Sequence, residues 1–95
     1  MKLNGIYKDV ANRVTTGITE DRLIDYINTI VEGNNYKNLS TRVASGVQMV
    51  TFSPAEICDW YDKYNCNDSH ITTLFKKVIR ENYPKAWEII QRNGR

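Results

Sequence analysis

Cysteine and histidine side chains stand close together in the C-terminal half of the sequence, at Cys58, Cys66 and His70. Thiolate and imidazole groups are preferred zinc ligands, and a thiol beside an imidazole can act as a nucleophile. A zinc site would need Asp62 as its fourth ligand, and no phosphate-binding loop or metalloprotease motif supports catalysis. We therefore expect no metal, no cofactor and no enzymatic activity, with Cys58 buried between helices, His70 exposed and both thiols reduced.

Basic side chains gather in the last third of the chain. Residues 66–95 contain six Lys or Arg and three Asp or Glu, whereas the whole chain has a net charge of only +2. A local positive charge favours contact with a polyanion such as DNA. No apolar run is long enough for a secretion signal or a membrane span, so we expect a cytoplasmic protein without membrane contact.

The elements that would position these residues belong to one small domain, residues 1–95, with 41% hydrophobic residues. In its first part, Ile6, Val10 and Val14 recur every four residues, which predicts a short helix that ends near Gly17. Thr19 can cap a second helix, predicted over 20–32 from the helical spacing of its apolar residues.

Residues 36–53 allow two interpretations. Leu39, Thr41 and Val43 alternate with Ser40 and Arg42, and Val47, Met49 and Thr51 stand at every second position after a short Ala-Ser-Gly break. We predict a small β-hairpin near residues 39–52 from this alternation. A helix from Ser40 to Ser45 is the alternative. The predicted fold class is therefore mainly α, with four to five short helices and this hairpin.

Ser53, Pro54 and Glu56 form the clearest helix start in the chain, because they supply a cap, a first-turn proline and a residue that can bond back to the cap. The helix from Pro54 would place Ile57, Trp60, Tyr61 and Tyr64 on one side and break at 65–68. Asp68 or Ser69 would cap an amphipathic helix over 70–82, and Pro84 would open a last short helix that carries Trp87 and Ile90.

A capped helix, a polar break and a basic amphipathic helix make residues 54–80 resemble a helix-turn-helix DNA-binding unit. Glu56-Ile57-Cys58 stands where that family often has Glu-Ile-Ala, and Ile71 and Leu74 would be the buried residues of the recognition helix. The resemblance extends to the helical unit 54–92 and implies a DNA-binding transcription regulator whose 69–82 helix enters the major groove. The side chains that it implies as base readers are Asn67, Ser69, His70, Thr72 and Thr73. Those implied at the phosphates are Lys76, Lys77, Arg80 and Lys85, and palindromic recognition leaves homodimerisation open.

A protein-binding module is the alternative function, of the kind by which compact phage or mobile-element proteins inhibit or adapt a host protein complex. Such a module needs an exposed apolar or acidic patch. Trp60 and Tyr61, with Asp59 and Asp62 beside them, are the predicted patch.

Overall fold

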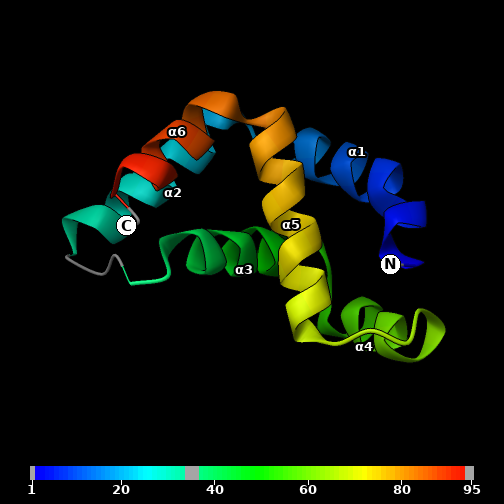
Figure 1. The fold of residues 1–95 in the computed structure, drawn as a ribbon. Coiled ribbons are helices and arrows are strands. Elements are labelled where there is room, and N and C mark those ends of the chain that lie inside the picture. Colours follow the sequence, from blue (N-terminus) through cyan, green and yellow to red (C-terminus); the bar gives the residue numbers. More distant parts are fainter. Residues whose placement is uncertain (1, 34–36, 94–95) are drawn as a thin grey trace.

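The computed structural model describes residues 2–33 and 37–93, and these ranges contain helices and no strand (Figure 1). The mainly α prediction is confirmed, but four to five helices is too few, because six α-helices follow an initial 3₁₀ helix. The elements are the 3₁₀ helix Lys2–Ile6, α1 (Tyr7–Gly17), α2 (Glu20–Glu32), α3 (Leu39–Thr51), α4 (Pro54–Lys63), α5 (Asp68–Asn82) and α6 (Pro84–Asn93). In the described parts, no helix has the length and apolar character needed to cross a membrane.

Helix α5 is the central element of the fold (Figure 1). It packs against α3, α1 and α6, while α2 pairs mainly with α6. Its apolar residues, which have the predicted spacing of three and four, are almost completely buried. They are Ile71, Leu74, Phe75, Val78 and Ile79. One continuous core therefore surrounds α5, and the other helices present apolar residues to it.

The first two α-helices agree with the sequence patterns. Val10 and Val14 of α1 are buried, and α2 covers the predicted 20–32 range. The hydroxyl of Thr19 accepts a hydrogen bond from the backbone N–H of Arg22 at 3.2 Å, as expected of an N-cap residue. Local signals were sufficient here because each helix carries a single apolar face and α2 also carries a side-chain cap.

The predicted hairpin near residues 39–52 is wrong, because these residues form helix α3. Leu39, Val43 and Val47 recur every four residues and are all buried, so the same residues that alternate like a strand also make a helical stripe. The adjacent α5 supplies apolar surface that covers this stripe. Tertiary packing thus decides between two local patterns, and the alternative helix Ser40 to Ser45 was correct in type but too short.

Capping residues fix the starts of α4 and α5. The predicted capping box at Ser53 and Glu56 is present, with Pro54 as the first helical residue. For α5 the cap is Asn67, not Asp68 or Ser69. Asn67 Oδ1 accepts from the backbone N–H of His70 at 3.1 Å, and His70 Nδ1 accepts from the backbone N–H of Asn67 at 3.2 Å. The helix therefore begins two residues before the predicted 70–82 range.

Candidate interaction surfaces

The two thiols and the imidazole have different surroundings from those that the sequence predicts. Cys58 is exposed and not buried between helices as predicted, since α4 buries little beyond Ile57. Cys66 is half-buried, its Sγ donates to the carbonyl of Trp60 at 3.3 Å, and burial raises the pKa of this thiol. His70 is half-buried rather than exposed, and its Nδ1 is occupied by the α5 cap. Across the described ranges, no three His, Cys, Asp or Glu side chains come together as metal ligands.

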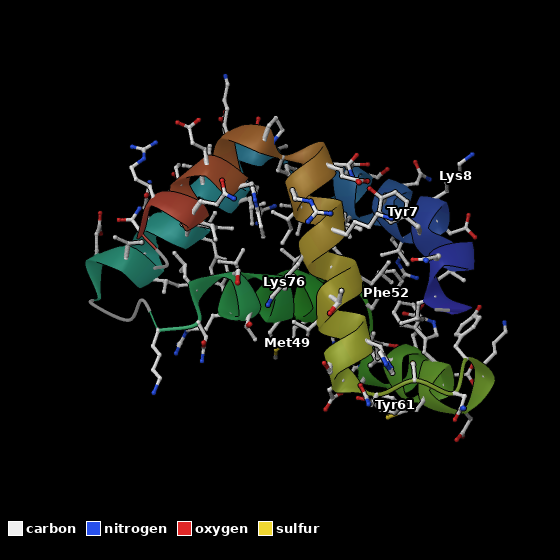
Figure 2. The ribbon with its side chains drawn as sticks, viewed as in Figure 1. Tyr7, Lys8, Met49, Phe52, Tyr61 and Lys76 are labelled. Carbon is white, nitrogen blue, oxygen red and sulfur yellow. The ribbon has the colours of Figure 1, made fainter. Side chains whose placement is uncertain are left out.

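Five of the nine predicted DNA-contacting residues share one face of α5, which we call the α5 face. Ser69, Thr73 and Arg80 are exposed, while the other two members are half-buried. The spacing of three, four and seven residues places them in a line along the helix. The α5 face consists of Ser69, Thr72, Thr73, Lys76 and Arg80, and Figure 2 shows Lys76 extending from α5 on the side of α3.

The other four predicted DNA contacts are placed differently. Asn67 and His70 make the reciprocal cap of α5, so Asn67 Oδ1 and His70 Nδ1 already accept backbone hydrogen bonds. Lys77 lies over the ring of Tyr7 on α1, with its Nζ 4.9 Å from the ring centroid. Lys85 lies in the first turn of α6, beyond the end of α5. The structure therefore does not bring these residues onto the α5 face.

Helix α4 meets α5 through aromatic side chains rather than along its length. The ring of Trp60 lies 5.1 Å from that of Phe52 and 6.5 Å from that of Phe75, measured between centroids. Tyr61 donates a hydrogen bond to Asp68 at the start of α5. The backbones of α4 and α5 do not pack side by side, and α4 extends from the N-terminal end of α5 (Figure 1). The resemblance to helix-turn-helix units thus covers the order of the elements and not their close packing.

The predicted protein-binding patch is only partly exposed. Trp60 and Tyr61 are half-buried, and Trp60 belongs to the aromatic cluster with Phe52 and Phe75. Asp59 and Asp62 are exposed. The aromatic residues of α4 therefore stabilise the docking of this helix more than they offer a free apolar surface.

The most exposed large apolar side chains lie instead on α3, where the sequence interpretation had placed a hairpin. Met49 is 76% exposed and Val50 is 71% exposed, and we call this adjacent pair the α3 ridge. Figure 2 shows Met49 at the lower edge of α3. Val50 stands three residues after Val47 and seven after Val43, both buried, so it continues the apolar stripe of α3. The structure leaves this position of the stripe uncovered.

A groove between α2 and α3 borders the ridge. It has a volume of about 390 Å³, its walls are mostly apolar, and Arg22 is the one charged side chain among its lining residues in the described structure. Besides the two ridge residues, this α2–α3 groove is lined by Ile18, Arg22, Leu23, Tyr26, Gly46 and Val47. A second hollow, of about 320 Å³, lies on the other side of Met49 and reaches Phe52, Ile57 and Tyr61.

A glycine determines the shape of the groove. A Cβ atom added at Gly46 would lie 2.7 Å from Cε2 and Cζ of Tyr26, well inside normal van der Waals contact. Because Gly46 has no side chain, the ring of Tyr26 rests directly on the backbone of α3 and forms one wall of the groove. Tyr26 itself is 41% exposed, so the wall is accessible to a ligand.

Charged residues line two of the hollows that Val50 borders. Arg22 lines the α2–α3 groove, and Asp9 lines another hollow that also reaches Thr51. Arg13, in that same hollow, is already paired with Glu56 through nitrogen–oxygen distances of 2.6 and 2.9 Å. In the parts of the chain that the structure describes, neither Arg22 nor Asp9 lies within 4.0 Å of an oppositely charged group.

The sequence contains part of the information needed to predict the α3 ridge. On a helical projection of 39–51, Met49 falls on the side away from Val43 and Val47, so the helical alternative would have exposed it. Nothing in the sequence shows that Val50 lacks a covering element. Comparison with known proteins does not supply a function either, since the chain matches no protein-family model, no curated protein and no solved structure.

Proposed function

We propose that this chain is a non-enzymatic protein-binding domain whose α3 ridge and α2–α3 groove dock a partner protein. The observation that carries the proposal is the exposure of Met49 and Val50, two adjacent apolar residues with a hollow on each side. Single exposed apolar residues are ordinary, but a ridge that borders apolar hollows is typical of an interaction surface. Covering either side chain would contribute about 1.5–3 kcal/mol to binding.

The groove also offers the mixture of groups found at interaction sites. Tyr26 presents a rigid ring with a hydroxyl at its edge, and aromatic residues of this kind are enriched at interfaces. Arg22 can form a charge-assisted hydrogen bond with a carboxylate of the partner. The site would therefore bind a protein surface that combines apolar side chains with an acidic residue.

Capture from a lysate of the source organism tests this function, with Val50→Glu and Thr73→Glu compared against the wild-type chain. Both substitutions place a glutamate at an exposed β-branched position of a helix, but Thr73 lies on α5 and not beside the ridge. We expect Val50→Glu to lose partners that Thr73→Glu retains. A partner set that is the same for all three proteins would exclude the α3 ridge as the docking site.

Duplex DNA binding by α5 is a second candidate function, supported by the exposed line of Ser69, Thr73 and Arg80 with Lys76 beside it. A helix presenting small polar and basic side chains could lie in the major groove with its basic residues at the phosphates. Affinity for duplex DNA should then fall with salt, and Lys76→Ala with Arg80→Ala should reduce the log–log slope by about one per lost phosphate contact. Absence of binding at low salt, or an unchanged slope, would exclude this function.

A further inference from the structure

We infer that α4 opens as a separate unit, in which its helical hydrogen bonds break and it leaves the core while the other helices stay folded. Local unfolding of this kind occurs in segments that have few buried apolar contacts. Ile57 is the only buried residue of α4, all of which the structure describes, whereas α5 buries five residues. The opening does not depend on a partner, because it follows from how α4 is held.

Aromatic side chains rather than backbone packing hold α4 in place. The other helices of the described ranges each pack along a further helix, but α4 extends from the end of α5 without such packing (Figure 1). The ring of Trp60 lies 5.1 Å from that of Phe52 and 6.5 Å from that of Phe75, between centroids. Release of this one ring would therefore free most of α4 from the core.

Two polar links add little to this attachment. The ion pair of Arg13 with Glu56 joins α1 to α4, and both side chains are exposed, at 49% and 38%. Tyr61 donates a hydrogen bond to Asp68 at the start of α5, again at the surface. Polar links that face water stabilise a fold weakly, because water competes for the same groups. The contact of Trp60 is thus the main connection between α4 and the core.

The neighbouring helices do not need α4 to complete their ends. The backbone N–H of Phe52 donates to the carbonyl of Gln48 at 3.0 Å and closes the last turn of α3. Asn67 and His70 cap α5 with their own side chains. Extended backbone at 52–53 and the break at 64–67 join α4 to these two helices. Both neighbours can therefore keep their hydrogen bonds when α4 opens.

Opening changes both α4 and the surface that it covers. A helix of ten residues is too short to be stable alone in water, so the backbone N–H groups of released α4 exchange with solvent. The rings of Phe52, now 8% exposed, and Phe75, now fully buried, lose their cover. The hollow beside Met49 loses the walls that α4 provides. The apolar surface next to the α3 ridge therefore differs between the closed and open states.

Native-state hydrogen exchange of the full chain, followed residue by residue by NMR, tests this opening. Helix α6 is the matched comparison, because it also has ten residues and begins with a proline, but it packs against α2 and α5. We expect the amides of 58–63 to exchange at least about tenfold faster than those of 88–93 and of the centre of α5. Low urea should accelerate exchange strongly in α5 and weakly in α4, since the effect of urea scales with the surface exposed.

Two substitutions separate this opening from unfolding of the whole chain. Trp60→Ala should accelerate exchange in both α4 and α5 by at least about tenfold, because either opening loses the contact of this ring. Trp60→Phe should give the same pattern with a smaller acceleration, and it replaces the alanine variant if that one does not fold. Ile90→Val leaves a small cavity at a buried position of α6. It should accelerate α5 by about two- to tenfold and leave α4 unchanged, because Ile90 stays buried when α4 opens.

Equal exchange rates and equal urea dependence in α4 and α5 would overturn the inference, as would amides of α4 that exchange no faster than those of α6. A rate in α4 that the Trp60 variants leave unchanged would also overturn it, because the amides would then exchange without release of the aromatic contact. Equal acceleration of α4 and α5 by Ile90→Val would show that α4 unfolds only with the rest of the chain, and would overturn it as well.

Discussion

The hydroxyl oxygen of Tyr83 lies 2.6 Å from the carbonyl oxygen of Ile18 and 3.2 Å from that of Val14. Both carbonyls are at the C-terminal end of α1, where that of Val14 already accepts the backbone N–H of Ile18, and that of Ile18 belongs to the C-cap residue. Tyr83 itself follows α5 and is only 3% exposed. A single side chain thus connects the end of α1 with the junction between α5 and α6, and burial raises the pKa of its hydroxyl.

Replacement of Tyr83 by phenylalanine should lower the free energy of unfolding by about 1–3 kcal/mol, because the carbonyl of Ile18 loses a buried donor. Urea denaturation followed by circular dichroism measures this change, and the dependence on urea concentration should keep its slope. Tyr7→Phe is the matched control, since the Tyr7 hydroxyl bonds to Glu81 on the exposed surface and its loss should cost less. Equal losses for the two variants would contradict the role of Tyr83.

Glu20 should stabilise α6 as well as its own helix. Its Oε2 accepts hydrogen bonds from the backbone N–H groups of Lys85 at 3.0 Å and Ala86 at 3.4 Å, in the first turn of α6. Glu20→Gln removes the charge from this helix terminus, and we expect a loss of about 0.5–1.5 kcal/mol in the free energy of unfolding. Asp21→Asn changes a charge in the same turn of α2 without contacting α6, so thermal unfolding should show a smaller loss for that variant.

Gly46→Ala should reshape the α2–α3 groove without unfolding α3. The added Cβ would overlap the ring of Tyr26, so the ring must rotate away from α3. Alanine improves helix propensity by about 0.5–1 kcal/mol, which should offset part of the displaced packing. We expect near-wild-type thermal stability together with weaker capture of the partner proteins that the wild-type chain retains. Ser45→Ala, at the exposed neighbouring position of α3, should leave the captured partners unchanged.

Acid should weaken the connection between α1 and α4. The pKa of Glu56 is lowered from its ordinary value of 4.5, first by the hydrogen bond from Arg13 and then by the backbone N–H of Ser53. A carboxyl whose pKa is lower in the folded state stabilises the protein above its unfolded pKa, and this stabilisation is lost as the pH falls through the folded value. The stability difference between wild type and Glu56→Gln should therefore be largest near neutral pH and vanish in strong acid. A difference that stays constant between pH 7 and pH 2 would exclude this linkage.

Much of the fold follows from local signals in the sequence. The main exception is residues 39–51, where contacts with another helix decide the structure. Thr19 and the pair Ser53 and Glu56 predict helix starts because a capping side chain bonds within its own turn. Residues 39–51 have β-branched residues at positions that satisfy both periods, so only the packing of α5 on α3 selects the helix. The sequence predicts Asn67 as a base-reading residue, whereas the structure shows it as the cap of α5. Its side-chain amide suits both roles, so the residue type alone does not distinguish them.

The candidate site was less predictable than the fold. Helical spacing was sufficient to place Ser69, Thr73 and Arg80 on one face of α5, because that face depends on one helix alone. The exposure of Val50 depends on what α1 and α2 leave uncovered, and no local pattern encodes it. Cys58 is exposed because α4 docks through Ile57, Trp60, Tyr61 and Tyr64, and Cys58 is not among these packed residues.

The pairing of α2 with α6 also determines when α2 can be buried during synthesis of the chain. Leu23 and Ile27 of α2 belong to the buried core, yet α6 joins them from the far end of the sequence. Domains tend to fold as units during translation, at about 5–20 residues per second. Until the last helix leaves the ribosome, the apolar side of α2 lacks its main cover, so a nascent chain stalled before Pro84 would be a substrate for chaperones and proteases.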